Sequence, residues 1–333
     1  MNINIVDIVC GLSWGDEAKG KLVTHIIKYN HYDFVCRWAG GNNAGHTIYK
    51  NGKKYKTHLI PCGIFYGVKS IIGPECVINE ESFFRELEYL KANNFDISLI
   101  KVSPKAHVIT KEHIEIDKSK YKDQGTTSCG IAPCYSDKYA RKGIRAETIE
   151  TLKEYIWDEE LWGNVLCEGA QGFWLDINYG NYPYVTSSTT LPYGACSLGF
   201  PPQKIQKIIG ASKIYDTRSG IDPLFPDSLL EDEDLLKLIN EGKEIGTTTG
   251  RTRKTNWLDL DKLITAINIS GVTEIIISKV DVLEKVGKYK LFFNKDLMSF
   301  ESILNMKEFI ETTLLKECGL LKLVIFSSNV EDI

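Results

Sequence analysis

Ile8-Val9-Cys10-Gly11-Leu12-Ser13-Trp14-Gly15-Asp16-Glu17-Ala18-Lys19-Gly20-Lys21 is the stretch that decides the fold of this chain. It continues an apolar run that begins at Ile3, which predicts a buried strand, and it precedes apolar residues at helical spacing over 22–27. A strand, a glycine loop and a helix in this order direct backbone N–H groups and a helix N-terminus at a phosphate. We therefore expect a P-loop-like phosphate loop after the first strand, although the spacing G-x-x-x-x-G-K-[ST] of an ordinary P-loop is absent.

Asp16 is the residue that a simple phosphate loop does not explain. Lys19 and Lys21 supply positive charge, but a carboxylate adds nothing to a site that only binds an anion. A site that also moves a proton or holds Mg²⁺ does gain from it. The alternative is a plain turn, with glycines for geometry and lysines facing solvent. That alternative leaves unexplained both the acid between two glycines and the polar loops further along the chain.

The composition is that of an ordinary globular protein and excludes several classes. Hydrophobic residues make up 43% of the 333 residues and charged residues 25%, and the net charge is −4. The acidic balance argues against a nucleic-acid partner. No apolar stretch reaches the ~20 residues of a membrane helix, so we expect no membrane partner. Nine cysteines form no C-x-x-C pair, which argues against zinc and indicates reduced thiols in the cytoplasm.

Strand and helix signals alternate along most of the chain. Short apolar runs predict strands at 33–38, 97–102, 165–167, 205–215, 275–277 and 321–326, with a strand and turn over 71–78. Helical periodicity is found at 80–93 and 228–241, and Asn51-Gly52 predicts a hairpin over 49–55. This pattern predicts one α/β domain over residues 1–333, with a largely parallel central sheet and helices on both faces.

Polar glycine loops follow several of these strands. Open α/β sheets bind ligands where strand ends open into such loops. The arginines of the loop 246–254 suit a carboxylate or phosphate, because guanidinium binds either with two parallel hydrogen bonds. The carboxylate of Asp281, just after a strand, can accept hydrogen bonds from N1–H and the 2-amino group of guanine. Within the loop 39–47, His46 offers a proton or a hydrogen bond near neutral pH.

Together these segments resemble those of the adenylosuccinate synthetase family. Eight motifs occur in the family's order and span nearly the whole chain: 15–21, 41–47, 58–61, 125–127, 168–172, 182–188, 248–251 and 278–281. The family joins L-aspartate to C6 of a purine nucleotide in two steps. GTP phosphorylates O6 of IMP, and the aspartate amino group then displaces phosphate to give adenylosuccinate. The resemblance thus implies a Mg²⁺-dependent ligase of purine nucleotide biosynthesis that forms a C–N bond.

The resemblance also implies roles for individual residues. Asp16 is implied to be the base at N1 and a Mg²⁺ ligand with the Gly45 carbonyl, while His46 polarises O6; Lys19 and Gln171 complete the catalytic set. The residues implied to bind the donor GTP are Gly15, Glu17, Ala18, Gly20, Lys21, Gly45, Thr47, Lys279, Asp281 and Ser327. Those implied to bind the acceptor are Asn43, Thr127, Arg141, Gln171, Thr186 and Ser219, with Arg141 acting across a homodimer interface. Those implied to bind aspartate are Thr249, Arg251 and Arg253.

The chain departs from the family pattern at several positions. Ala18 replaces a glycine of the phosphate loop, Cys129 stands where an arginine is common, and Asn178 replaces a carboxylate. Ser219 replaces a valine beside the acceptor ribose. These departures leave the chemistry intact and bear on the identity of the acceptor, its sugar and the donor.

Three alternatives compete with this interpretation. A phage branch makes 2-aminoadenylosuccinate from dGMP, with ATP or GTP, for diaminopurine DNA. Some of its members have serine at the position of Asp16, so the aspartate favours IMP, and the retained segment 278–281 favours GTP. A regulatory GTPase would need an ordinary P-loop. A catalytically dead scaffold would have lost Asp16 or His46, and both are present.

Overall fold

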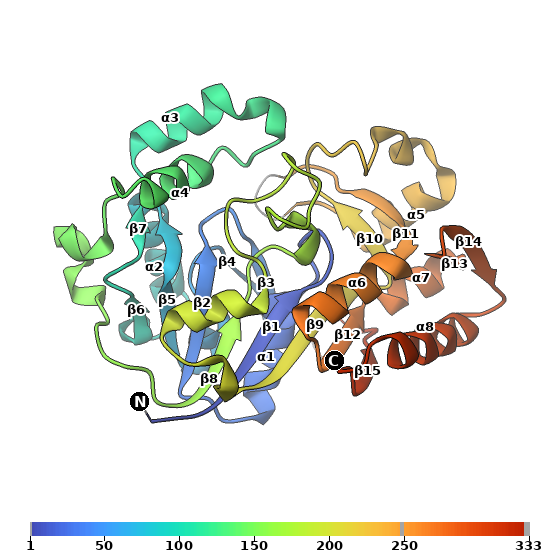
Figure 1. Ribbon diagram of the computed structural model, residues 1–333, viewed down its shortest axis with the longest axis horizontal. Helices are drawn as coiled ribbons and strands as arrows, with labels where there is room; N and C mark the ends of the chain where they lie inside the picture. Colours follow the sequence, from blue (N-terminus) through green and yellow to red (C-terminus); the bar gives the residue numbers. More distant parts are fainter. Residues whose placement is uncertain (1, 247–249, 330–333) are drawn as a thin grey trace.

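The protein is built around a nine-stranded sheet in which every neighbouring pair is parallel (Figure 1). The computed structural model describes residues 2–246 and 250–329. The sheet has the order β15-β12-β9-β1-β8-β2-β5-β6, with β7 beside β5. Its strands are β1 (Ile3–Gly11), β2 (Phe34–Gly40), β5 (Lys69–Ile78), β6 (Ile100–Val102), β7 (His107–Val108), β8 (Gly163–Glu168), β9 (Ile205–Lys213), β12 (Glu274–Ser278) and β15 (Leu323–Phe326).

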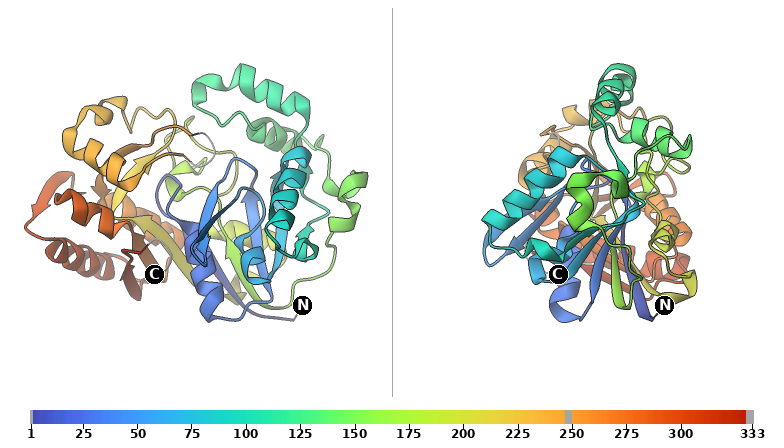
Figure 2. Two further views of the ribbon diagram at one scale, coloured as in Figure 1. Left: turned by 180° about the vertical axis from the view of Figure 1, so that it is seen from behind. Right: turned by 90° about the vertical axis from the view of Figure 1, so that its left-hand side faces the viewer.

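Helices cover both faces of this sheet, as the sequence predicts (Figure 2). On one face, α1 (Lys19–Tyr29) and α2 (Glu80–Ala92) bury apolar side chains such as Val23 and Phe83. On the other, α6 (Leu260–Ser270) and α8 (Ile303–Glu317) bury Leu263 and Ile310. The other helices are α3 (Lys111–Lys120), α4 (Ile131–Tyr139), α5 (Glu233–Gly242) and α7 (Val280–Val286). Strand β1 lies between β8 and β9, so its loop opens near the middle of the sheet.

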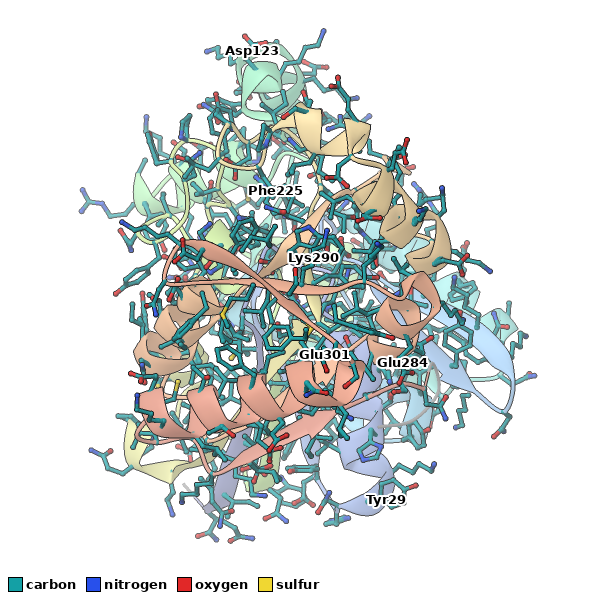
Figure 3. All side chains as sticks on the ribbon, turned by 90° about the vertical axis from the view of Figure 1, so that its right-hand side faces the viewer. Tyr29, Asp123, Phe225, Glu284, Lys290 and Glu301 are labelled. Carbon is teal, nitrogen blue, oxygen red and sulfur yellow. The ribbon has the colours of Figure 1, made fainter. Side chains whose placement is uncertain are left out.

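A second sheet of four strands was not expected from the sequence. It has the order β10-β11-β13-β14 and mixes antiparallel and parallel pairs. Its strands are β10 (Tyr215–Arg218), β11 (Lys254–Asp259), β13 (Tyr289–Phe293) and β14 (Asp296–Phe300). Lys290 of β13 (Figure 3) lies 3.2 Å from Asp234 of α5, so an ion pair links this sheet to a helix. The run 205–215, predicted as one strand, thus leaves the central sheet and enters the second one.

The hairpin is confirmed, whereas the turn expected within 71–78 is wrong. Strands β3 (His46–Lys50) and β4 (Lys53–Thr57) pair around Asn51 and Gly52, both with positive φ. Strand β5 instead runs unbroken through Gly73. A Cβ at that position would lie 2.5 Å from the carbonyl oxygen of Arg37, so the glycine there permits close approach of β2. The pairing register shifts at the same place, which accommodates Gly73 and Pro74 within the strand.

The remaining boundaries differ only locally. The acidic helix predicted over 228–241 is a short 3-10 helix over 227–231 followed by α5, which Asp232 caps. One apolar core cluster includes residues as distant as Ile3 and Val324. That residues 1–333 form a single domain stays a prediction. Among the described residues, no helix is long and apolar enough to cross a membrane.

Asp216 of β10 is a buried carboxyl whose environment penalises its charge. It accepts a hydrogen bond from the backbone N–H of Asp259 (2.9 Å). Burial raises its pKa to about 7, and the nearby Asp259 carboxylate adds to this effect. Because the pKa is raised in the folded state, Asp216 stabilises the fold while it is protonated, and this contribution is lost as the pH rises through about 7.

The variant Asp216→Asn should therefore be more stable than the parent protein at alkaline pH. Asparagine keeps the acceptor for the Asp259 N–H and carries no charge. Each pKa unit corresponds to about 1.4 kcal/mol, so the difference should reach a few kcal/mol near pH 8 and shrink towards about pH 5. Thermal unfolding across this pH range measures it, with the exposed Asp296→Asn as the control. A constant difference at all pH values would contradict the assignment.

Candidate active site

The phosphate loop is held in shape by the buried side chain of Glu17. Its Oε1 accepts hydrogen bonds from the N–H groups of Ser13 (3.1 Å) and Gly15 (2.8 Å), and its Oε2 lies 2.6 Å from Lys19 Nζ. A Cβ at Gly172 would lie 2.4 Å from Oε1, so that glycine leaves room for the carboxylate. Glu17, predicted to bind the donor, therefore contacts the loop itself in this structure.

Positive φ angles give the loop its sharp path. Gly15, Asp16 and Ala18 have φ values of 88°, 64° and 63°. Ala18 is the N-cap of α1 and occupies the left-handed conformation that costs a non-glycine residue roughly 1–2 kcal/mol. Alanine at position 18 is thus accommodated in the left-handed conformation with strain.

The residues predicted to bind the donor come together between α1 and the ends of β12 and β15. Lys21 Nζ donates to Ser327 Oγ (2.7 Å) and also contacts the backbone oxygen of Asn329. The backbone N–H of Val280 donates to the carbonyl of Ser327 (3.3 Å), which places Lys279 and Asp281 at the same edge. A small hollow lies here, lined by Glu17, Ala18, Lys21, Ala211, Ile276 and Ser278.

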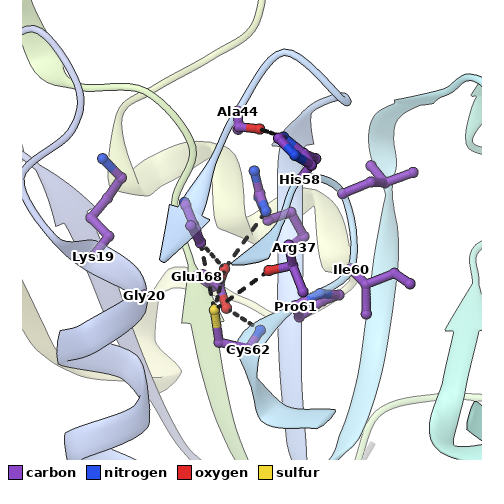
Figure 4. A network of polar contacts seen from close by, with 12 residues as sticks. Lys19, Gly20, Arg37, Ala44, His58, Ile60, Pro61, Cys62 and Glu168 are labelled. Atoms are coloured by element: carbon purple, nitrogen blue, oxygen red, sulfur yellow. Dashed lines mark hydrogen bonds and ion pairs between the residues drawn. The ribbon is translucent and has the colours of Figure 1, made fainter. Parts of the chain in front are cut away.

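His46 lies against the phosphate-loop helix and forms a buried pair with Glu168; Figure 4 shows Glu168 beside Cys62 and Arg37. A Cβ added to Gly20 would lie only 2.9 Å from the Cβ of His46, so the glycine allows this approach. His46 Nδ1 contacts Glu168 Oε1. Glu168 Oε2 accepts from the backbone N–H of Cys62 (2.7 Å), and Arg37 Nη1 lies 3.6 Å from Oε1.

The pKa values of His46 and Glu168 depend on their burial and on the charge of Arg37. Burial would raise the pKa of Glu168, but the contacts with His46 and Arg37 outweigh it and hold the pKa below its usual range. Burial lowers the pKa of His46, and Glu168 only partly offsets this. Because a carboxylate only accepts, Nδ1–H donates to Glu168, and Nε2 is the nitrogen left to exchange a proton.

Arg37 is a fully buried guanidinium behind this pair. None of its three side-chain nitrogens has a hydrogen-bond partner within residues 2–246 and 250–329. Its charge therefore acts on Glu168 at a distance of 3.6 Å and not through a well-formed hydrogen bond. The sequence analysis missed both residues, although Glu168 directly follows a predicted strand and opens one of the eight motifs.

Two sets of side chains can be considered for a metal. His46, Cys62 and Glu168 offer ligand atoms within 4.8 Å of one another, the one such trio in the described part of the chain. The positive charge of Arg37 beside Glu168 disfavours a cation there. Asp16 and the Gly45 carbonyl instead offer hard oxygen donors near the phosphate loop, which is the chemistry that Mg²⁺ prefers alongside phosphate oxygens. These residues fit Mg²⁺, and their role as its ligands stays a prediction.

Asp16 forms an ion pair with a residue from the C-terminal half of the chain. Its Oδ2 lies 2.8 Å from Nε of Arg253, which was predicted to bind aspartate. Arg253 is also 2.7 Å from Glu244, a buried residue that the sequence analysis missed. Arg251 lies nearby in sequence, exposed, with its carbonyl accepting from Gly246 N–H (2.8 Å). Thr249, the third predicted aspartate-binding residue, lies outside the described residues.

Most residues predicted to bind the acceptor lie on loops that touch one another. Ser188 Oγ donates to Gln171 (3.2 Å) and lies 3.2 Å from Thr186 Oγ1. Gln171 has a φ of 54°, and a Cβ at Gly40 would lie 3.2 Å from its Oε1. Ser188 was missed as a site residue, although the run of hydroxyls over 186–190 signals it.

The loops around Thr127 and Ser219 form the other side of the acceptor set. A Cβ at Gly125 would lie 2.9 Å from the backbone N of Ile221, so these two loops are in contact. Arg218 holds the second loop through Ser219 O (2.8 Å) and Asp222 (3.3 Å). The hydroxyl of Ser219 is buried and makes no hydrogen bond with the described residues.

Three predicted residues have less distinctive surroundings. Asn43 Oδ1 accepts from Gly41 N–H (3.2 Å), within the glycine loop. Thr47 is half-buried on β3, next to His46. Arg141 lies exposed just beyond α4, apart from these loops in the single chain.

Residues 8–161 and 148–294 match the family model for adenylosuccinate synthetase. The chain belongs to the adenylosuccinate synthetase family. It is 37% identical to the synthetase of Clostridium perfringens and 38% identical to that of Helicobacter acinonychis. These matches cover 87% and 86% of this chain and 81% of each relative.

Solved structures agree with this membership. The fully ligated adenylosuccinate synthetase of Plasmodium falciparum superposes with a TM-score of 0.83 at 29% identity, over 98% of this chain and 97% of that one. A cyanophage S-2L succinoaminodeoxyadenylate synthetase, bound to dGMP and dATP, has a TM-score of 0.69 at 19% identity, over 94% and 100%, and shares the fold. As a member of the adenylosuccinate synthetase family, the chain is a GTP-binding ligase of purine biosynthesis that forms a C–N bond.

The contact at Gly20 predicts the effect of adding one methyl group to this synthetase. Gly20→Ala should push α1 away from His46 and Cys62, whose Cβ and Sγ would lie 2.9 and 3.2 Å from the new atom. A displacement of this kind should lower kcat/KM by about tenfold to a hundredfold. Steady-state kinetics measure it, with Gly319→Ala as the control, because a Cβ there meets nothing. Equal activity of the two variants would show that the approach is not required.

Proposed function

We propose that this synthetase ligates L-aspartate to C6 of IMP, with GTP as phosphoryl donor, through a 6-phosphoryl intermediate. The observation that carries the proposal is the meeting of two proton-handling groups at one phosphate loop. His46 packs against Gly20 of the helix that follows the loop, and Asp16 within the loop pairs with Arg253. A phosphate loop that only bound a nucleotide would need neither group.

The first step makes O6 of IMP a leaving group. Asp16 takes the proton from N1, which moves electron density onto O6. O6 then attacks the γ-phosphorus of GTP, the bond to the β-phosphate oxygen breaks, and GDP leaves. Lys19, whose position the carboxylate of Glu17 fixes, contributes its charge to the transferring group. The negative charge of that group favours the protonated form of His46, which then donates from Nε2 while Glu168 holds Nδ1–H.

The second step forms the new C–N bond. The α-amino nitrogen of aspartate attacks C6, the C6–O6 bond breaks, and inorganic phosphate leaves with O6. Arg253 is suited to the carboxylates of aspartate or to the leaving phosphate, because its guanidinium already binds the carboxylates of Asp16 and Glu244. Arg251 and Thr249 are proposed to share this role.

Mg²⁺ is proposed to bind Asp16, the Gly45 carbonyl and phosphate oxygens. The ion supplies charge neutralisation between the phosphates when bound. The residues of the chain position the nucleotides around it, with Lys21 and Gly20 at the phosphates and Lys279, Asp281 and Ser327 at the guanine.

IMP is favoured over dGMP as the acceptor. Asp16 is retained, and the relatives at 36–38% identity are adenylosuccinate synthetases. The phage protein that binds dGMP is 19% identical, a level that supports only a common fold. The acceptor is proposed to lie between Gln171, Thr186 and Asn43 on one side and Thr127 and Ser219 on the other.

A homodimer and a cytoplasmic location without nucleic-acid partners complete the proposal. Arg141 is exposed beyond α4 with a φ of 61° and can reach a second subunit. Tyr139 and Tyr193, 66% and 61% exposed, offer apolar surface that a partner can cover. These features support an acceptor site completed by Arg141 of the other subunit.

An assay of substrate pairs tests the assignment. Purified protein is given aspartate and Mg²⁺ with each pairing of IMP, GMP or dGMP with GTP or ATP, and products are identified by mass. We expect adenylosuccinate, GDP and phosphate from IMP and GTP, with at least about tenfold lower kcat/KM for every other pairing. Preferred use of dGMP would replace the proposed function by the phage-type reaction.

The charge of Asp16 should matter for turnover and far less for binding. Asp16→Asn keeps the shape of the side chain but removes the base, so kcat should fall by at least about two orders of magnitude. Affinity for IMP, measured by calorimetry, should change far less. If the folded variant stays within tenfold of the parent kcat, Asp16 serves the loop conformation and not proton transfer. Asp123→Asn, on the exposed turn after α3, is the matched control.

A further inference from the structure

Glu244 lies at the centre of a buried charge cluster that the steps above do not use. It is fully buried between α5 and β11. Its Oε2 accepts from Arg253 Nη1 (2.7 Å) and Lys213 Nζ (3.0 Å). Its Oε1 accepts from the hydroxyl of Tyr215 (2.7 Å) and lies 3.6 Å from Lys279 Nζ. One carboxylate thus holds three cations that come from three separate segments of the chain.

Each of these three cationic side chains also lies next to a different part of the candidate active site. Arg253 continues to Asp16, 2.8 Å away in the phosphate loop. Lys279 opens α7, two residues before Asp281, and its Nζ donates to the carbonyl of Gly242 (2.7 Å). Lys213 ends β9 and donates to Thr217 Oγ1 (2.8 Å), next to Arg218 and the acceptor loop. The two oxygens of Glu244 therefore face two functions, with Oε2 towards the reacting groups and Oε1 towards the donor base.

Electrostatics make the cluster depend on this carboxylate. Burial would raise the pKa of Glu244, but Lys213, Lys279 and Arg253 together hold it well below its usual range, so it stays ionised. Burial lowers the pKa of Lys213, and the charge of Glu244 opposes that loss. Removing one partner of such a buried set leaves uncompensated charge, which side chains relieve by moving apart. Without Glu244, Arg253 and Lys213 would repel each other.

Backbone contacts place Glu244 at the base of the segment that carries the arginines. The Arg253 N–H donates to the carbonyl of Glu244 (2.9 Å), and Ile245 forms a bridge with Thr252. The Glu244 N–H donates to the carbonyl of Ile239 in α5 (3.0 Å). These backbone contacts hold Glu244 in place, and its carboxylate lies between Lys279 and Arg253.

We propose that Glu244 is a positioning residue that couples the donor-base segment at Lys279 to the Arg253–Asp16 pair. GTP that binds Lys279 and Asp281 holds the start of α7 against Glu244. Glu244 in turn holds Arg253 in the position in which it binds aspartate. Donor and aspartate should therefore bind with positive cooperativity, and the coupling should require the charge of Glu244. The inference rests on the proposed function, because it assigns guanine and aspartate to these segments.

Equilibrium binding tests the coupling directly. Calorimetry measures the affinity for L-aspartate in the presence of IMP and Mg²⁺, with and without guanosine 5′-(β,γ-imido)triphosphate. For the parent protein we expect the analogue to tighten aspartate binding by at least about fivefold. In Glu244→Gln, which keeps size and the acceptor for Tyr215, the tightening should fall below about twofold. Glu241→Gln, at an exposed glutamate near the end of α5, should behave as the parent does.

Other variants separate positioning from folding. Glu244→Asp keeps the negative charge on a side chain that is shorter by one methylene group, so this variant should fold and retain part of the coupling. It replaces Glu244→Gln in the test if the glutamine variant does not fold. A purely structural role would lower the melting temperature and leave the coupling of every folded variant intact, which would overturn the inference. No coupling in the parent protein would also overturn it. Failure of the proposed function would be seen differently, as absence of turnover by the parent with IMP, GTP and aspartate.

Discussion

The close approach of α1 to the beginning of β3 at Gly20 is the constraint on which the rest of the site depends. The helix starts directly after the phosphate loop, so any residue larger than glycine there would separate Lys19 from His46. The sheet fixes the other side of this contact. Strand β8 lies between β1 and β2 and ends in Glu168, which holds His46 from behind. The groups proposed for phosphate binding and for proton transfer thus share one point of the fold because two backbones meet there.

The polar side chains that carry the proposed chemistry are each held by a buried charged residue. Lys19 is held by Glu17, His46 by Glu168, and Asp16 by Arg253. Buried ion pairs contribute little net stability, because desolvation offsets much of their attraction. Their value here is geometric: a charged group with a fixed partner needs little reorganisation as charge develops in the transition state. Arg37 lies behind Glu168, and Glu244 lies behind Arg253, so each of these two pairs has a further charged residue on the side away from the substrates.

The sequence predicts those features that local patterns determine. The phosphate loop, the hairpin and most strands of the central sheet depend on short-range signals, and the family motifs contain most of the predicted site residues. The unbroken strand β5 was missed because Gly73 and Pro74 read as a turn, and only the register shift in β2 accommodates them. The second sheet was missed because β10, β11 and β13 pair across long separations in sequence, although β13 and β14 form a hairpin. Glu244 stands in the polar run 241–244, which reads as solvent-exposed, and only its distant partners reveal a buried residue.

The central claim is that O6 of the acceptor leaves as phosphate after the GTP-dependent step. IMP carrying ¹⁸O at O6, incubated with the protein, GTP, Mg²⁺ and aspartate, tests it by mass spectrometry of the released phosphate. The account predicts that the label appears in inorganic phosphate in proportion to the adenylosuccinate formed, with none in GDP. Adenylosuccinate formed while the label passes into water would contradict the phosphoryl intermediate, and with it the joint role of Asp16, His46 and the phosphate loop.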